Sequence, residues 1–173
     1  RDTIPRLTAA IPQGTFRVAD SQVASRWGNI LEFEGFDLIT PNEREARFAL
    51  GDQDSVVRPL ALELHQRSKC KTLILKLGDR GIITYRSNSP VDFRAFFTVE
   101  SFADRVIDAV GAGDALLAYA TLALVATKND VIASILGNMA AAIECEHEGT
   151  VPVTPEEVLK KVDTVERHVN YQH

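Results

Sequence analysis

The chain has 173 residues, of which 45% are hydrophobic and 25% are charged, values typical of one globular domain with a sizeable core. Its net charge of −5 argues against a general nucleic-acid-binding or membrane-surface protein, because both kinds of partner attract clustered lysines and arginines. Cys70 and Cys145 lack zinc-type spacing, which favours a reducing, cytoplasmic setting.

The first half of the chain alternates short apolar runs with segments of helical periodicity. Asn42 stands as an N-cap before one such segment, and Gly78 and Gly81 stand at the turn between two apolar runs. The elements expected here are, in chain order, a strand over 15–20, a helical or irregular connection over 21–30, a strand over 36–40, helices over 42–50 and 59–68, and strands over 72–78 and 81–86.

The second half begins with strand candidates and continues with helices. Its elements are expected to be strands over 93–100 and 104–108 and helices over 114–127, 130–147 and 154–170. The last helix opens with a capping box, Thr154 and Glu157, with Pro155 at its first position. The alternation of strands and helices predicts an α/β fold with a largely parallel sheet. In such sheets ligands bind beyond the carboxyl ends of the strands.

The stretch Gly111-Ala112-Gly113-Asp114 precedes a strongly apolar helix. The two glycines leave no Cβ in the way of a ligand, and successive N–H groups with the positive end of the helix dipole would form an anion site. A carboxylate at position 114 would repel a bound phosphate. We therefore expect Asp114 to face a substrate hydroxyl, orient it and accept its proton during phosphoryl transfer. The alternative is a structural loop whose Asp114 only caps the helix.

Four segments resemble, in the same order, the motifs of the ribokinase-like (PfkB) carbohydrate kinase family, and they cover nearly all of the chain. They are the Asn-x-x-Glu segment within 39–46, the Gly-x-x-Gly hairpin within 73–85, the Gly-Ala-Gly-Asp signature within 107–119 and the C-terminal helices and Gly turn within 138–158. Within this family, residues 18–46 are most similar to the sugar-kinase domains of ADP-heptose synthases.

The resemblance implies a three-layer ribokinase-like α/β fold with a largely parallel central sheet. Residues 1–173 would be a single partial kinase domain, the C-terminal nucleotide-binding part, because nothing in the chain matches the N-terminal sugar-binding and lid portion. Removing that portion would expose an apolar sheet edge, so we expect a homo-oligomer or association with the missing N-terminal portion.

The resemblance also implies roles for individual residues. Asp114 would be the catalytic base, and Gly111, Ala112 and Gly113 would hold the transferring phosphoryl group. Asn42 and Glu45 would hold Mg²⁺ through its waters. Asp108 would lie near a monovalent-cation site, with K⁺ as the candidate ion. The residues expected to contact ATP are Lys76, Gly78, Gly81, Asn138, Ala141 and Ala142.

Structural alternatives exist for these assignments. Asn42 and Glu45 could form only a capping box, and Asp108 could be a turn carboxylate bonded to nearby backbone N–H groups. The remaining alternatives are a satisfied core amide at Asn138, a tight turn at Gly78 and Gly81, and a side chain that faces solvent at Lys76.

Together these features predict an ATP-dependent carbohydrate kinase that transfers the γ-phosphoryl group to a hydroxyl of a sugar or sugar phosphate. A heptose phosphate is one candidate substrate. The alternative is a nucleotide-binding module that lacks sugar kinase activity and acts through a partner. Ala109, which stands where the family usually has Thr, favours that alternative. The expected ligands are a nucleotide and a small sugar, without nucleic acid or membrane.

Overall fold

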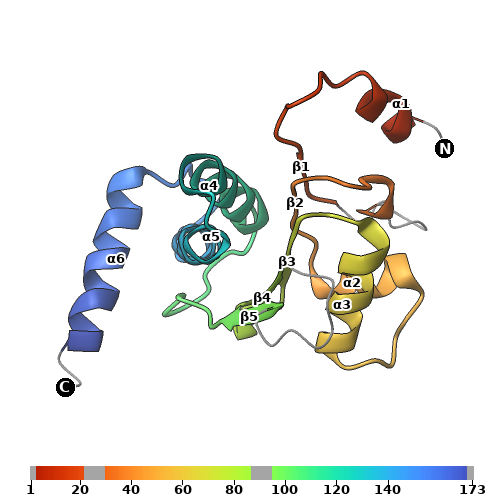
Figure 1. Cartoon of the computed structure of the whole chain (residues 1–173). Coiled ribbons are helices and arrows are strands. Elements are labelled where there is room, and N and C mark those ends of the chain that lie inside the picture. The colour runs from red at the N-terminus through yellow and green to blue at the C-terminus, as the bar shows by residue number, and fades with distance from the viewer. Residues whose placement is uncertain (1–2, 22–29, 87–94, 171–173) are drawn as a thin grey trace. The chain divides into compact units, whose positions relative to one another are not determined.

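The computed structural model describes residues 3–21, 30–86 and 95–170 (Figure 1). The chain divides into two compact units, Arg1–Val99 and Glu100–His173, and each is described by itself. The connection predicted over 21–30 lies almost wholly outside the described residues. Among the helices of the described ranges, none is both long enough and apolar enough to cross a membrane.

The first unit is built on a five-stranded sheet in the order β1-β2-β3-β4-β5. Its strands are β1 (Val18–Ala19), β2 (Leu38–Ile39), β3 (Thr72–Lys76), β4 (Ile82–Tyr85) and β5 (Phe96–Val99). Strands β1, β2 and β3 are parallel, with Leu38 paired to both Val18 and Thr72, whereas β4 is antiparallel to β3 and β5. The parallel strands and the β3–β4 hairpin confirm the predicted α/β sheet, although β1 and β2 are shorter than the apolar runs that predicted them.

Two helices, α2 (Glu43–Leu50) and α3 (Val57–Ser68), pack against β3, and α3 also contacts β4 (Figure 1). They bury an apolar core in which Leu64, Leu73 and Leu75 are fully inaccessible. Two 3-10 turns, η1 (Ile30–Glu32) and η2 (Gly78–Arg80), complete the unit. A short helix over Thr3–Ala9, α1, was not predicted and buries none of its residues.

The second unit contains the three predicted helices, α4 (Ala112–Thr127), α5 (Asp130–Cys145) and α6 (Pro155–Asn170). A Cβ at Gly137 of α5 would lie 2.9 Å from the carbonyl oxygen of Leu116 and 3.1 Å from Cβ of Ala120, so the missing side chain lets α4 and α5 pack closely. The predicted capping box of α6 is confirmed, since the backbone N of Thr154 donates to Glu157 Oε2 over 2.8 Å and Thr154 Oγ1 accepts from the backbone N of Glu157.

The strand predicted over 104–108 is wrong. Residues 100–110 form a loop, and the backbone N–H groups of Ile107 and Asp108 both donate to the carbonyl oxygen of Cys145 at the end of α5. The apolar residues of this segment suggested a strand, but their backbone donors are taken by a helix terminus and not by a neighbouring strand.

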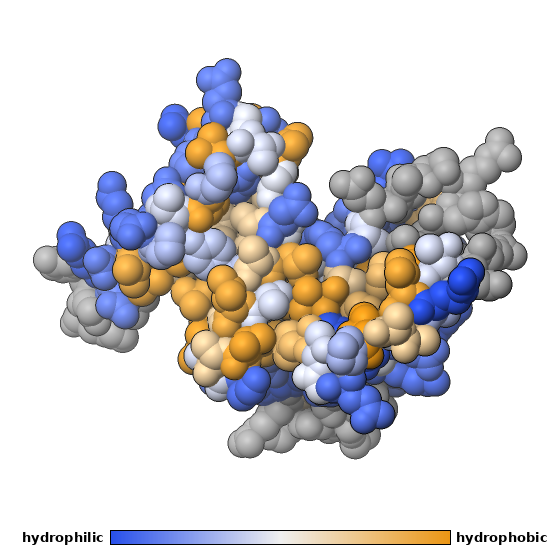
Figure 2. All heavy atoms as spheres, turned by 90° about the horizontal axis from the view of Figure 1, so that it is seen from above, coloured by the Kyte–Doolittle hydropathy of each residue, from blue (hydrophilic) through white to orange (hydrophobic). Residues whose placement is uncertain are grey.

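Hydrophobic side chains also lie at the surface (Figure 2). Helix α4 is apolar nearly all round, and it exposes Leu122 and Val125 as well as burying Leu116 and Leu124. A helix with this composition is normally covered on every side, so α4 has an apolar side that its own unit leaves open.

Candidate active site

The carboxyl ends of the three parallel strands bring charged and polar residues together in the first unit. Asp20 follows β1, Asn42 lies just beyond β2, and Lys76 ends β3. Lys76 Nζ lies 2.6 Å from Asp20 Oδ2, and the two side chains are only 18% and 20% exposed. The Lys76 backbone N donates to the carbonyl oxygen of Pro41 over 2.9 Å, and a parallel bridge pairs Lys76 with Asn42. This edge is therefore a largely desolvated cluster of opposite charges.

Asn42 and Glu45 form a complete capping box at the start of α2. The backbone N of Asn42 donates to Glu45 Oε2 over 2.7 Å, and the backbone N of Glu45 donates to Asn42 Oδ1 over 2.8 Å. Burial raises the pKa of Glu45, which is only 5% exposed, and the charge of Asp20 raises it further, against the opposing effects of the Asn42 N–H and of Lys76. The predicted capping box is thus present, and the role of the pair toward Mg²⁺ stays a prediction. The box uses one oxygen of Glu45 and leaves Oε1 for another partner.

The donor set at this edge fits Mg²⁺ held largely through water. Asp20, Asn42 and Glu45 all offer oxygen ligands, which this hard cation prefers. Thr40 Oγ1, directly after β2, is buried and lacks a hydrogen-bond partner within the described ranges. Those ranges contain no group of three or more His, Cys, Asp or Glu side chains that could hold a metal ion alone. A site with few direct ligands suits Mg²⁺, which keeps several waters and completes its shell with substrate phosphates.

Asp20 is a candidate functional residue that none of the sequence motifs contains. Its signal was a carboxylate placed directly after an apolar run, where a parallel strand ends at the ligand-binding edge of the sheet. No local pattern linked it to Lys76, which is 56 positions further along the chain.

The hairpin after β3 is tight because two glycines adopt positive φ. Gly78 has φ 66° and Gly81 has φ 83°, and the backbone N of Leu77 donates to the Gly81 carbonyl oxygen over 2.8 Å. Arg80, between the glycines, forms an ion pair with Glu43 of α2. The glycines therefore serve a tight turn, as the structural alternative predicts, and their role toward a nucleotide stays a prediction.

In the second unit, the start of α4 is where the sequence predicts an anion site. Gly111 adopts φ 91°, and a Cβ there would lie 2.5 Å from Glu144 Oε1 and 3.0 Å from Thr150 Cγ2, so only glycine fits. No side chain of the described part of the chain caps this helix end. Asp114 is exposed in the first turn, and with Gly111 and Glu144 it lines a cavity of about 260 Å³. The start of α4 thus lies beside a hollow that Gly111 and the exposed Asp114 line.

The other residues predicted in this unit have structural partners. Asp108 Oδ1 accepts a hydrogen bond from the backbone N of Val110 over 2.9 Å, as expected of a turn carboxylate. The buried Asn138 donates from Nδ2 to the carbonyl oxygen of Glu100 over 2.7 Å, as expected of a satisfied core amide. Ala141 and Ala142 lie on the same helix, α5. Their roles toward a cation or nucleotide stay predictions.

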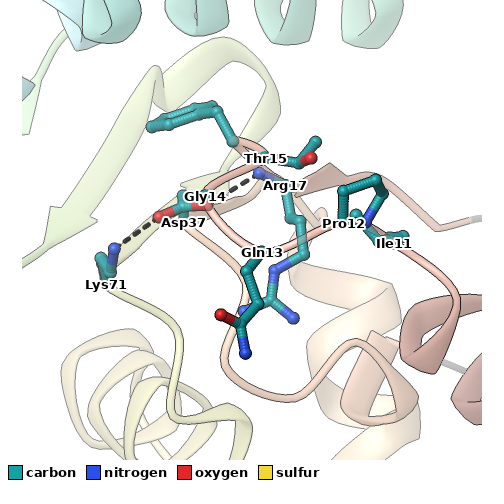
Figure 3. Close-up of a pocket in the computed structure, with 9 residues that line it drawn as sticks. Ile11, Pro12, Gln13, Gly14, Thr15, Arg17, Asp37 and Lys71 are labelled. Atoms are coloured by element: carbon teal, nitrogen blue, oxygen red, sulfur yellow. Dashed lines mark hydrogen bonds and ion pairs between the residues drawn. The ribbon is translucent and has the colours of Figure 1, made fainter.

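A further cavity, of about 420 Å³, lies at the opposite, amino ends of the parallel strands (Figure 3). Asp37 at its rim accepts from the backbone N of Arg17 over 2.7 Å and pairs with Lys71 Nζ at 2.6 Å. Burial raises the pKa of Asp37, but the Arg17 N–H and the Lys71 ammonium outweigh it and hold the pKa below the usual 3.8. None of the predicted site residues lies here, and ligands of parallel sheets bind at the other edge, so we assign this cavity to the framework.

The first unit thus brings Asn42, Glu45 and Lys76 together with Asp20, and the second places Gly111 and Asp114 around one hollow. Comparison with known proteins shows which family the chain carrying these two clusters resembles. Residues 2–157 match the pfkB family carbohydrate kinases. The "Bifunctional protein HldE" of Pelobacter propionicus is 30% identical over 135 residues, which are 75% of this chain and 26% of that protein. Relatives of this name confirm the predicted resemblance to ADP-heptose synthases.

Two solved structures show the fold. The ribokinase of Thermotoga maritima is 26% identical with a TM-score of 0.73, and the match covers 91% of this chain and 52% of that one. Phosphofructokinase-2 of Escherichia coli, solved in complex with potassium, is 22% identical with a TM-score of 0.77, and the match covers 94% and 52% of the two chains. The predicted ribokinase-like α/β fold is confirmed. The chain spans about half the length of these structures and about a quarter of that of the HldE protein.

Proposed function

The chain belongs to the pfkB family of carbohydrate kinases, and we propose that it carries the nucleotide side and the catalytic base of an ATP-dependent sugar kinase. The reaction is transfer of the γ-phosphoryl group to a hydroxyl of a sugar or sugar phosphate. The kinship with HldE proteins makes a heptose phosphate the first substrate to try.

The observation that carries this proposal is the start of α4. Gly111 turns the chain in a conformation that only glycine fits, no described side chain caps the helix, and Asp114 is exposed in its first turn. N–H groups at a helix N-terminus stabilise negative charge, which a transferring phosphoryl group spreads over its oxygens. A carboxylate beside that site is suited to orient a hydroxyl nucleophile and accept its proton.

Each of the predicted site residues has a role in the proposed phosphoryl transfer. Asp114 takes the proton of the sugar hydroxyl as its oxygen attacks phosphorus, while the backbone N–H groups of Gly111, Ala112 and Gly113 hold the phosphoryl oxygens. Lys76 donates to a nucleotide phosphate. Its ammonium has three donors, so it can stay paired with Asp20 and still donate to a second acceptor. Gly78 and Gly81 let the hairpin backbone approach the nucleotide, and Asn138, Ala141 and Ala142 border its base.

Mg²⁺, when bound, would neutralise phosphate charge at the strand-end cluster, with Asn42 and Glu45 contacting its waters. A monovalent cation near Asp108 belongs to the same proposal, supported by the potassium in the phosphofructokinase-2 structure. The apolar side of α4 and the edge strand β1 support association with a second copy or with an N-terminal kinase portion.

The test is a phosphotransfer assay with Mg-ATP and a panel of sugars and sugar phosphates, comparing the wild type with Asp114→Asn. We expect turnover with one sugar class and a loss of about 100-fold or more in kcat in the variant, because a positioned base contributes roughly that factor. Equal turnover in the two proteins would refute the role of Asp114. Nucleotide binding without turnover on any sugar would favour the nucleotide-binding module instead.

A further inference from the structure

The loop that leads to the start of α4 is held by the end of α5. The carbonyl oxygen of Cys145 accepts the N–H groups of Ile107 and Asp108 at 2.7 and 3.2 Å. One position further, Glu146 Oε1 accepts the backbone N of Asp104 at 3.0 Å. These bonds fix 104–108, the segment just before Gly111 and Asp114, so the placement of the candidate catalytic residues depends on how firmly α5 holds this loop.

Helix α6 contacts this anchor through Lys161. Its Nζ lies 2.8 Å from Glu146 Oε1, the same oxygen that accepts the Asp104 N–H, and 3.3 Å from Asp104 Oδ2. The Lys161 side chain is only 13% exposed, and that of Glu146 is 24% exposed. An ion pair screened from water in this way holds its geometry better than a surface pair, which contributes little.

The charges around this end of α5 explain why a cation is needed. Asp104, Asp108, Glu144 and Glu146 all lie at or next to the helix terminus, which carries the negative end of the α5 dipole. Without Lys161, the Glu146 carboxylate would face the carboxylate of Asp104 and the helix end unneutralised. It would then turn toward solvent and release the Asp104 N–H.

We propose that Lys161 is a positioning residue for the candidate catalytic loop. Lys161 fixes the Glu146 carboxylate, and Glu146 holds the backbone at Asp104. The loop is thereby held in one conformation, which fixes the positions of the N–H groups of 111–113 and of Asp114. The proposal rests on the proposed function in one respect: those N–H groups contact the terminal phosphoryl group of ATP, which ADP lacks.

The chain supplies a matched control on the same helix. Lys160 is the neighbour of Lys161, is exposed, and loses the same charge when replaced. The experiment compares Lys161→Met, Lys160→Met, Glu146→Gln and Lys161→Arg by hydrogen exchange of the loop amides and by calorimetric titration with Mg-ATP and Mg-ADP. Glu146→Gln weakens the same link from its other side with little change of shape. It therefore serves as the second variant if Lys161→Met disturbs the packing of α6.

We expect the amide of Asp104, which donates to Glu146, to exchange about tenfold faster in Lys161→Met and in Glu146→Gln, since a hydrogen bond to a charged group contributes roughly that factor. The ratio of the ADP to the ATP dissociation constant should fall toward one in both variants. Lys160→Met should leave both quantities at wild-type values, and Lys161→Arg should restore them in large part.

Loop exchange in Lys161→Met that matched Lys160→Met would overturn the proposal. So would faster exchange with an unchanged ADP-to-ATP ratio, because Lys161 would then support the fold without positioning the phosphate contacts. If the wild type bound neither nucleotide, the proposed function would fail, and the exchange rates alone would still decide whether Lys161 holds the loop.

Discussion

The two edges of the parallel strands carry ion pairs of the same length in different surroundings. At the carboxyl edge Lys76 and Asp20 lie 2.6 Å apart and are both largely buried, beside Asn42 and the buried Glu45. At the amino edge Lys71 and Asp37 also lie 2.6 Å apart, but the Lys71 side chain is 77% exposed. The amino edge has the cavity of about 420 Å³, and the carboxyl edge has the residues that match the family's motifs.

Neither a short ion pair nor a hollow is therefore enough to identify a site. The amino-edge pair secures strand ends, because Asp37 is satisfied by the Arg17 N–H and by Lys71. The carboxyl-edge pair keeps opposite charges out of water beside an oxygen-rich donor set, where an incoming phosphate or cation gains most from them.

The largest difference between the two edges should appear when Lys76 and Lys71 are replaced in turn. Lys76→Met should weaken Mg-ATP binding about tenfold or more, because a charged donor to phosphate is lost and Asp20 is left unpaired. Lys71→Met removes the same charge at the other edge and should change the dissociation constant by less than about twofold. Calorimetric titration measures both dissociation constants, and equal losses in the two variants would show that the two edges do not differ in nucleotide binding.

A smaller effect should follow from removing the N-cap of α2. Asn42→Ala should lower the free energy of unfolding by about 1 kcal/mol, the usual value for such a cap, and should also weaken Mg-ATP binding. The matched control is Asn129→Ala at α5, where Asn129 Oδ1 accepts from the backbone N of Val131 and of Ile132. Urea unfolding should show a similar loss of stability for Asn129→Ala, with unchanged ATP affinity. A loss of affinity in both variants would mean that stability alone is responsible.

The smallest effect should be in the pH dependence of the free energy of unfolding. The pKa of Asp37 at the amino edge is lowered and the pKa of Glu45 at the carboxyl edge is raised, so the two groups change stability in opposite directions as the pH falls. The lowered pKa of Asp37 means that its ionised form stabilises the fold above the usual value of 3.8, and that this contribution is lost as the pH falls through the folded pKa. The pKa of Glu45 is raised above the usual 4.5, so ionisation of Glu45 costs stability, and the cost is relieved as the pH falls through the raised value.

Urea unfolding from about pH 7 down to about pH 3.5 checks this prediction. The stability advantage of the wild type over Asp37→Asn should shrink at the acid end. Relative to Glu45→Gln, the wild type should instead gain stability as the pH falls toward 4.5. Parallel curves for the two variants would contradict the assignment of opposite shifts.

Local sequence signals predicted most of the fold and part of the site. Asn42 with Glu45, Gly78 with Gly81, and Thr154 with Glu157 mark element ends through bonds between near neighbours, and all three features are found. The strand predicted over 104–108 and the missed helix α1 show where local preference fails, because β-pairing depends on a neighbouring strand and α1 has no buried face.

The site was harder to predict where its contacts are distant in sequence. The Asp20–Lys76 pair and the Lys161–Glu146 contact join different elements, so no short sequence pattern predicts them. The loop of Gly111 and Asp114 was found because its glycines and its carboxylate are adjacent.

We propose that this chain provides the nucleotide side of a sugar kinase, and calorimetric titration of the wild type and of Asp114→Asn with Mg-ATP is the decisive test. Both proteins should bind Mg-ATP with similar affinity, because Asp114 serves the hydroxyl and the backbone N–H groups hold the phosphate. A folded wild type that fails to bind Mg-ATP at millimolar concentration would refute this proposal.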